Sequence, residues 1–379
     1  MEDRTLLKDN CGYVRPGEVI ALMGPSGAGK STLLDVLANK KNVGTITGDI
    51  LLNGKKPDRY YNRCFGYVEQ FDSHMTCLTV QEAIAFSAKL RLPADMSTPQ
   101  KNKLVHKVMK QLELLPLKDR RIGGPGDSNS ISQEARKKVT IAVELVSNPG
   151  LLFLDEPTTG LDGGAAYAVM KTVRKLADEE KCSVICTIHQ PSAEVFGLFD
   201  KILLLQAGGK MVYFDDINKL EVYYDKHGFG KMEKGKNPAD FAIEAIEDAQ
   251  HLSSSPNDIW QQSHEWKKIV YDLEENKIRP MDIVPLTFNS LYATSFFTQM
   301  SCLISRSWKF FTRDTIGVMV RLVTGLFMGV MLGVLYWGIG GWDNESYKKN
   351  MFISILYVTV VYASESAAQE IPLLVYECL

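Results

Sequence analysis

The chain has 379 residues, enough for two or three domains, and its hydrophobic content of 45% is ordinary for a globular protein. Its formal net charge of −2 offers no basic footprint for nucleic acid, so we expect no nucleic-acid partner. The seven cysteines are scattered, and the spacing of the nearest pair, Cys182 and Cys186, matches no zinc site. We interpret them as reduced thiols of a cytosolic domain.

The sequence divides into two parts of different character. Residues 1–285 have the patterning of a soluble, mixed α/β protein, whereas the later residues are rich in Phe, Tyr, Trp, Leu, Val and Met. The later part also contains long uncharged runs. This contrast predicts an α/β domain followed by an all-α transmembrane segment.

The first functional motif lies between a predicted strand at residues 19–23 and a predicted helix that begins near Leu33. The pattern Gly-x4-Gly-Lys-Ser in this position is typical of a P-loop, whose backbone N–H groups bind phosphate oxygens at a helix N-terminus. We expect Lys30 to reach the β- and γ-phosphates of a nucleotide and Ser31 to ligate Mg²⁺. The alternative is a glycine-rich turn with a chance lysine, which the flanking strand and helix disfavour. The motif comprises Gly24, Pro25, Ser26, Gly27, Ala28, Gly29, Lys30, Ser31 and Thr32.

Two further strands are predicted after the P-loop helix, at residues 48–54, ending in an Asn-Gly turn, and at 64–70. Gln70 closes the second of these strands. A lone glutamine there is usually surface polarity, but its amide oxygen could serve as a neutral Mg²⁺ ligand. Helix-like patterns follow at residues 80–92 and 98–114.

Two acids end the next predicted strand, at residues 151–154, and Ser132 is the expected N-cap of the helix that precedes it. Buried carboxylates are costly without a cation, so their position near a P-loop favours a functional reading. Asp155 is predicted to hold Mg²⁺ directly or through water, and Glu156 to orient and deprotonate the attacking water. The alternative is two solvent-exposed acids at a strand end.

A histidine ends another predicted strand, where open α/β sheets place ligand contacts. His189 could donate to the γ-phosphate, although a lone histidine is as often structural. Residues 249–288, with many charges and a Ser-rich stretch, are interpreted as a linker. The other elements predicted here are a helix at 163–180, strands at 183–188, 201–205 and 212–214, and a helix that begins at Asn237.

A run of 21 uncharged residues, Leu322 to Trp342, predicts the first transmembrane span at about residues 318–340. A helix of this length, at about 1.5 Å per residue, crosses a bilayer core of roughly 30 Å. The alternative, a buried core helix, rarely runs so long.

A second span is predicted at about residues 350–372, where Glu365 and Glu370 interrupt the apolar run. The stretch 291–321 mixes apolar, aromatic and cationic residues, which is typical of a helix lying along the membrane interface. More Lys and Arg residues precede the first span than follow it, so we expect its N-terminal side, and the α/β domain, to be cytoplasmic.

Together these motifs resemble the nucleotide-binding domain and first spans of an ABC transporter, and the G subfamily in particular. Two stretches look characteristic of that subfamily, Thr187 to Ser192 and Asn237 to Phe241. The resemblance implies an ABC nucleotide-binding domain over 1–248 and the start of the transmembrane domain over 289–379. It implies the following roles: Gly24 to Thr32 as Walker A, Gln70 as the Q-loop glutamine, Asp155 and Glu156 as Walker B and catalytic glutamate, Asp162 as part of the D-loop, His189 as the switch histidine, and Ser132, Gln133 and Glu134 at the signature position.

The signature position departs from the family pattern. It reads Ile-Ser-Gln-Glu-Ala where the family has Leu-Ser-Gly-Gly-Gln, so both glycines are replaced. Side chains at Gln133 and Glu134 would block the approach of backbone amides to a partner's γ-phosphate, and Glu134 adds a like charge worth roughly 4 kcal/mol at about 4 Å and a dielectric near 20. This domain therefore combines a full catalytic set with a poor signature. That combination resembles the second half of full-length pleiotropic-drug-resistance-type transporters. We therefore expect a partner domain with an intact signature.

The resemblance implies the ATP-binding and ATP-hydrolysing part of a multi-pass ABC transporter that uses ATP and Mg²⁺ and exports hydrophobic compounds or lipids. Because the family's first strand and most of its spans are missing, we expect a fragment of a larger transporter. A soluble ABC-type ATPase acting on nucleic acid or ribosomes is one alternative, which the 21-residue span disfavours. A truncated, non-transporting product is the other.

Overall fold

The computed structural model describes residues 5–41, 43–124, 129–249, 254–275 and 290–335, together with residues 288, 337, 349, 354 and 356–358. The chain divides into two compact units, Met1–Leu303 and Ile304–Leu379. The first unit contains a β-sheet with surrounding helices, and in the described residues the second is helical.

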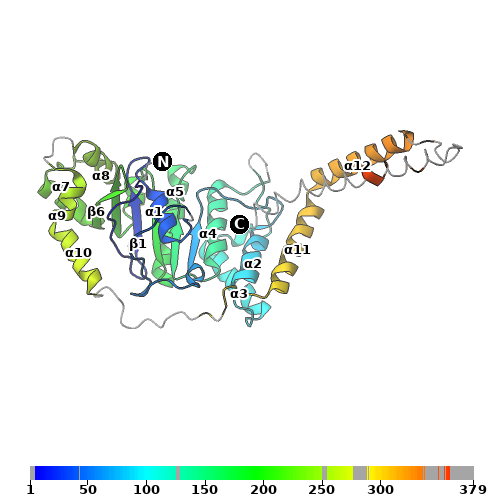
Figure 1. Ribbon diagram of the computed structural model, residues 1–379, viewed down its shortest axis with the longest axis horizontal. Helices are drawn as coiled ribbons and strands as arrows, with labels where there is room; N and C mark the ends of the chain where they lie inside the picture. The colour runs from blue at the N-terminus through cyan, green and yellow to red at the C-terminus, as the bar shows by residue number, and fades with distance from the viewer. Residues whose placement is uncertain are drawn as a thin grey trace. The chain divides into compact units, whose positions relative to one another are not determined.

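A six-stranded sheet forms the centre of the first unit, in the order β2-β3-β4-β1-β5-β6 (Figure 1). The first five strands in this order run parallel, and β6 pairs antiparallel with β5. Parallel strands covered on both faces have near-continuous apolar sequences, and every residue of β1 is buried. Because β2, β3, β4 and β1 are neighbours and run parallel, their carboxyl ends lie at one edge of the sheet. The strands are β1 (Val19–Met23), β2 (Phe65–Val68), β3 (Leu151–Leu154), β4 (Ser183–Thr187), β5 (Lys201–Gln206) and β6 (Lys210–Asp216).

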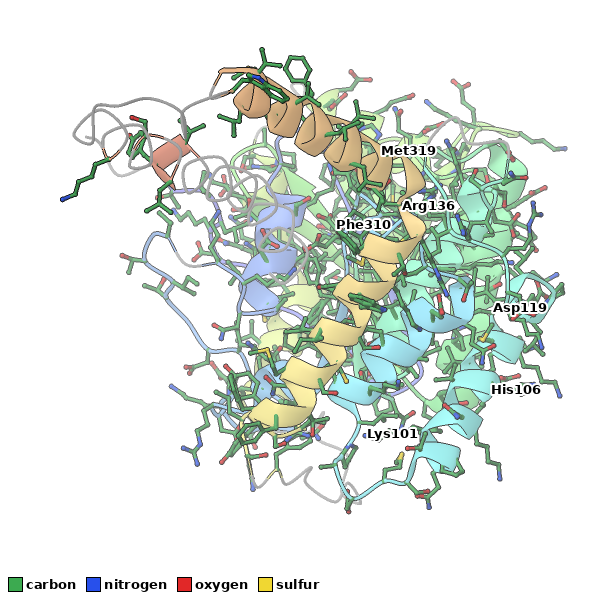
Figure 2. All side chains as sticks on the ribbon, turned by 90° about the vertical axis from the view of Figure 1, so that its right-hand side faces the viewer. Lys101, His106, Asp119, Arg136, Phe310 and Met319 are labelled. Carbon is green, nitrogen blue, oxygen red and sulfur yellow. The ribbon has the colours of Figure 1, made fainter. Side chains whose placement is uncertain are left out.

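The helices of the first unit begin largely where the sequence predicts. Ser132 caps α4 by accepting a hydrogen bond from the Ala135 N–H at 3.1 Å, as expected for a short hydroxyl side chain at an N-cap. Figure 2 shows Lys101 and His106 on α3. The helices are α1 (Lys30–Leu37), η1 (Tyr61–Arg63), α2 (Val80–Arg91), α3 (Thr98–Gln111), η2 (Leu115–Leu117), α4 (Gln133–Leu145), α5 (Gly163–Glu180), α6 (Ala193–Phe196), η3 (Ile217–Lys219), α7 (Leu220–His227), α8 (Pro238–Glu247), α9 (Pro256–Gln262) and α10 (His264–Glu274).

The two faces of the sheet contribute to two apolar clusters. Successive side chains of a strand point to opposite faces, and β3 shows this alternation directly. Leu152 and Leu154 belong to the main cluster, whereas Phe153 packs with Leu34 of α1 and with Phe65 of β2. The P-loop helix α1 is thereby fixed against the sheet.

The predicted strand at residues 48–54 is not a strand in the structure. Leu52 and Lys55 form an isolated antiparallel bridge around the predicted Asn-Gly turn, in which Asn53 and Gly54 both have positive φ. The turn chemistry was therefore correct, but an extended segment becomes a strand only when a neighbour supplies ladder hydrogen bonds. Leu51 is correspondingly exposed.

The predicted linker at residues 249–288 also requires correction. Within it, α9 and α10 form, and α9 packs against β6. The Trp260 side chain is fully buried beside the ring of Tyr213, with 5.6 Å between the ring centroids. The Asn257 side-chain amide donates to the Met211 carbonyl oxygen at 2.6 Å. The charged residues of this stretch lie on the outer side of short helices. The amino-acid composition of such helices is similar to that of a linker.

Trp260→Ala should therefore destabilise the first unit. Removing a fully buried tryptophan leaves a cavity and typically costs about 3–5 kcal/mol. The measurement is the thermal unfolding midpoint of the detergent-solubilised chain. Val222→Ala on α7, a site that is 68% exposed, is the matched control and should change stability by less than about 0.5 kcal/mol. Equal midpoints for the two variants would contradict the packing of α9.

The stretch 291–321, predicted as one interfacial helix, contains a complete helix and the start of a second one. α11 (Phe296–Arg313) ends before Asp314, and α12 (Thr315–Leu335) follows. Exposed apolar residues recur along one side of α11 at intervals of three or four: Phe297, Met300, Ile304, Trp308 and Phe311. This amphipathic pattern is the one expected of an interfacial helix.

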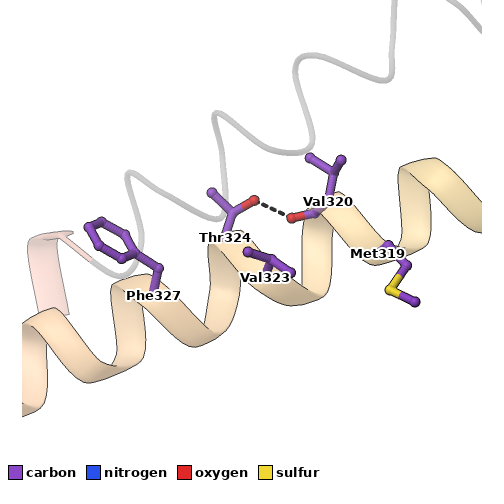
Figure 3. Close-up of a pocket in the computed structure, with 5 residues that line it drawn as sticks. All are labelled: Met319, Val320, Val323, Thr324 and Phe327. Carbon is purple, nitrogen blue, oxygen red and sulfur yellow. Dashed lines mark hydrogen bonds between the residues drawn. The ribbon is translucent and has the colours of Figure 1, made fainter.

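α12 is the one helix in the described residues that is long and apolar enough to cross a membrane. One side of it carries Met319, Val320, Val323, Thr324 and Phe327, which line a shallow apolar depression (Figure 3). The hydroxyl of Thr324 donates to the carbonyl oxygen of Val320 one turn earlier, so this polar group is satisfied within the helix. The predicted first span overlaps α12 up to residue 335. Nearly all of the predicted second span, 350–372, lies outside the described residues.

Candidate functional site

The P-loop connects the end of β1 to the start of α1, at the carboxyl edge of the sheet. Gly24 has a φ of 148°, and a Cβ there would collide with the carbonyl oxygen of Leu205. Gly29 is the N-cap of α1 in the left-handed region, with a φ of 95°. Around Gly27 a Cβ would meet nothing within 4 Å, so this side of the loop is open to a ligand. Backbone N–H groups at the start of α1 can therefore face an anion.

Lys30 folds back over its own loop. Its Nζ donates to the carbonyl oxygens of Gly24 at 2.9 Å and of Pro25 at 3.0 Å. Burial lowers the pKa of Lys30, while the nearby carboxylates of Glu156 and Asp155 raise it in opposition. The ammonium is thus held beside the loop by groups that an incoming phosphate could replace.

Asp155 directly follows β3 and connects the start of α1 to the end of β4. Its Oδ1 accepts hydrogen bonds from Ser31 Oγ at 3.0 Å and from Thr187 Oγ1 at 2.6 Å. Thr187 Oγ1 in turn accepts the backbone N–H of Glu156 at 2.8 Å. The threonine at the end of β4 therefore fixes both acids: the side chain of the first and the backbone of the second.

Glu156 is held next to Asp155 in an unusual backbone conformation, with a φ of 44°. Its Oε2 accepts hydrogen bonds from Gln70 Nε2 at 2.7 Å and from Thr159 Oγ1 at 2.9 Å. A positive φ is costly for a residue that is not glycine, and such strain is frequent at functional sites. The carboxylate therefore has a defined position next to the Gln70 amide.

The donor atoms of this cluster suit a hard divalent cation. Ser31 supplies a hydroxyl oxygen, Asp155 a carboxylate oxygen, and Gln70 keeps its amide oxygen available because its nitrogen serves Glu156. Mg²⁺ prefers oxygen ligands of this kind, together with water and phosphate oxygens. These three residues could therefore hold Mg²⁺ beside a nucleotide.

The other predicted site residues are placed less directly. His189 follows β4, the neighbour of β3, and its side chain is exposed. Asp162 is the N-cap of α5 and accepts from the Ala165 N–H at 2.9 Å. His189 thus adjoins the carboxyl edge of the sheet, and the roles of His189 in catalysis and of Asp162 in a D-loop remain predictions.

The signature residues begin α4. Ser132 is its N-cap and Gln133 is exposed. Glu134 forms an ion pair with Lys138 at 2.8 Å, one turn further along the helix. Part of the charge penalty expected from Glu134 is therefore compensated within α4, and the steric obstruction by two side chains is the stronger part of the argument.

Sequence reasoning missed two residues of the site. Thr187 is fully buried although polar, and a polar residue at the end of an otherwise apolar strand was its one signal. Lys137 is also buried, and its ammonium donates to the Gln70 carbonyl oxygen at 2.9 Å. Its sequence signal was hidden among the cations of Arg136, Lys137 and Lys138, which together look like a solvated helix face.

Comparison with known families agrees with this geometry. Residues 7–159 match a family model described as ABC transporter, and residues 189–269 match one described as ABC-2 type transporter. The second match covers elements from α6 into α10, so it concerns the sheet-containing unit and not the apolar helix α12. The fold and the phosphate-binding loop define a P-loop NTPase, and the first unit contains an ATPase domain of the ABC type.

The chain is homologous to ABC transporters of the G family. It is 42% identical to ABC transporter G family member 6 of Dictyostelium discoideum over 98% of this chain and 25% of the relative. It is 41% identical to member 2 of the same organism over 97% of this chain and 28% of the relative. The chain thus spans about a quarter of the length of these relatives. A solved dimeric ATP-binding cassette, bound to ADP and Pi, is 24% identical over 56% of this chain and 90% of that chain, with a TM-score of 0.47.

Proposed function

We propose that this chain binds and hydrolyses ATP as part of an ABC membrane transporter that exports hydrophobic compounds or lipids. The observation that carries the proposal is the convergence of Ser31, Gln70, Asp155 and Glu156 at the carboxyl edge of the sheet, next to the P-loop. Homology to G-family transporters supports the coupling to transport. The exported class rests on that family likeness alone.

Each group of residues in the site is proposed to have its own role in hydrolysis. The P-loop amides and Lys30 bind the phosphates, while Ser31, Gln70 and Asp155 would hold Mg²⁺, which neutralises phosphate charge when bound. Glu156 is placed to orient the attacking water and accept its proton. His189 is proposed to donate a hydrogen bond to the γ-phosphate from the adjacent strand end.

The membrane part is proposed to start with α11 and α12. The exposed apolar side of α11 suits the lipid interface, and α12 carries no charged residue between Leu322 and its end at Leu335. We propose a multi-pass membrane protein with a cytoplasmic ATPase domain. Recovery of the full chain in the soluble fraction after expression would favour the alternative, a soluble ABC-type ATPase.

The test of the proposed function is Mg²⁺-dependent ATP hydrolysis by the purified full chain, alone and mixed with an ABC domain whose signature is intact. We expect hydrolysis to rise when that partner is present, since the chain supplies a complete catalytic set with an obstructed signature. The proposal would be overturned if the chain hydrolyses no ATP, either alone or mixed with the partner domain. Reconstitution in vesicles then tests transport.

Restoring both signature glycines should raise hydrolysis in a forced homodimer. We expect Gln133→Gly/Glu134→Gly to increase turnover roughly tenfold, equivalent to about 1.4 kcal/mol, because backbone amides could then approach the partner's nucleotide. Gln133→Ala/Glu134→Ala is the matched control: it removes the charge but keeps the Cβ atoms, and should gain less. Equal turnover for the wild type and the glycine variant would contradict the obstructed-signature argument.

A further inference from the structure

One buried cation next to the site has been given no role so far. The Lys137 side chain on α4 is only 3% exposed. Its Nζ donates to the carbonyl oxygens of Gln70 at 2.9 Å and of Glu69 at 3.3 Å, and forms an ion pair with Asp72 Oδ1 at 2.8 Å. An ammonium has three N–H donors, and all three acceptors belong to the loop that follows β2. The loop therefore replaces the hydration of this cation.

The same loop carries the Gln70 side chain toward the acids. β2 ends at Val68, so the carbonyl groups of Glu69 and Gln70 lie beyond its ladder and need other donors. Lys137 supplies them from one side, while the Gln70 amide donates to Glu156 Oε2 at 2.7 Å on the other. The backbone and the side chain of Gln70 are thus held by two different elements.

A second attachment fastens the loop to the same face of α4. Thr140, three residues after Lys137, donates its hydroxyl to Asp72 Oδ1 at 2.6 Å, and His74 Nε2 lies 2.8 Å from the same hydroxyl oxygen. Burial lowers the pKa of His74 to about 4, so the ring is neutral near pH 7. With the Thr140 proton directed to Asp72, His74 Nε2 is the donor. The contacts form one continuous chain from His74 to Lys137.

We propose that Lys137 is a positioning residue for Gln70. Its ion pair with Asp72 and its bonds to two loop carbonyls set where the Gln70 amide lies relative to Asp155 and Glu156, and thereby set the affinity of the site for Mg²⁺. The inference rests on the proposed function, because it takes Gln70 as a metal ligand. In this proposal, α4, the helix that begins at the signature, positions the metal-binding loop through direct hydrogen bonds and an ion pair.

Lys137→Met tests the proposal, because it keeps most of the side-chain length and removes the donors. The readout is the Mg²⁺ dependence of binding of trinitrophenyl-ATP, a fluorescent analogue, to the full chain, which requires no hydrolysis. We expect the half-maximal Mg²⁺ concentration to rise about tenfold, with binding in EDTA within about twofold of wild type. Gln70→Ala should shift it similarly, and the double variant no further, because contacting residues that act through one another are not additive.

Lys138→Met is the matched control. Lys138 is the next residue of α4 and is also buried, with a side chain 7% exposed, but it pairs with Glu134 at 2.8 Å and Glu113 at 3.2 Å and not with the loop. This variant should lose stability without changing the Mg²⁺ response. Asp72→Asn/Lys137→Met removes both charges, so it should regain thermal stability relative to Lys137→Met while keeping the Mg²⁺ shift, because the carbonyls still lack a donor.

Two outcomes separate the inference from the proposed function. The inference alone would be overturned if Lys137→Met folds and has the same half-maximal Mg²⁺ concentration as the wild type. It would also be overturned if the shifts of Lys137→Met and Gln70→Ala add in the double variant. A wild-type chain that binds the analogue without any Mg²⁺ dependence would overturn the proposed metal site, and the role of Lys137 with it.

Discussion

Glu156→Gln should lower ATP hydrolysis about 10²- to 10⁴-fold while ATP binding remains. The amide keeps the size of the carboxylate, and the backbone N–H of residue 156 still donates to Thr187 Oγ1, but the new side chain cannot accept a proton from water. Loss of one negative charge beside the phosphates should leave nucleotide affinity equal or higher. The measurements are steady-state Mg²⁺-ATPase activity and equilibrium binding of a fluorescent nucleotide.

Glu69→Gln is the matched control for this prediction. Glu69 lies next to Gln70, but its carboxylate is exposed and forms an ion pair with Lys40 at 3.0 Å. The same chemical change there should alter hydrolysis by less than about twofold, since exposed ion pairs contribute little. Hydrolysis by Glu156→Gln at the wild-type rate would remove Glu156 from its proposed role.

Lys30→Ala should abolish most nucleotide binding. The ammonium is the one side-chain cation that the P-loop itself contributes, and truncating one partner of a buried charge pair costs about 2–5 kcal/mol, or roughly 30-fold or more in Kd. Its present acceptors, the carbonyl oxygens of Gly24 and Pro25, lose this donor on truncation. Fold retention is checked by the thermal unfolding midpoint.

The comparison for Lys30→Ala is Lys40→Ala. Lys40 follows the same helix and carries the same charge, but its side chain is 40% exposed and it contacts Glu69 and the ring of Tyr67. Its removal should leave nucleotide affinity within about twofold of wild type. Similar losses in the two variants would mean that overall charge, and not the position of Lys30, governs binding.

The parts of this protein that the sequence predicted well are contiguous ones. A phosphate-binding loop needs its backbone amides, lysine and hydroxyl within one turn between a strand and a helix, so nine consecutive residues are sufficient to indicate it. The acids that end β3 and the caps of α4 and α5 are likewise local features. Their placement follows from chemistry that operates over a few residues.

The errors occurred where pairing or packing decides the outcome. Residues 48–54 have strand-like composition, but in the described part of the chain no neighbouring strand pairs with them. Residues 256–274 have the charge content of a linker, and the burial of Trp260 against β6 makes part of them a packed helix. Neither result can be derived from local propensity, because each depends on what lies next to the segment in space.

By itself, the amino-acid sequence determined the fold class, an α/β sheet with a P-loop and an apolar helix after it, and it predicted a metal-binding acid and a proton acceptor beside that loop. The tertiary structure alone decided how these groups are held. Thr187 reaches Asp155 across 32 residues of sequence, and Lys137 reaches the Gln70 carbonyl across 67. Such contacts arise from strand order and from the face that α4 turns to the loop, and these are set by burial of the whole core and not by any local pattern.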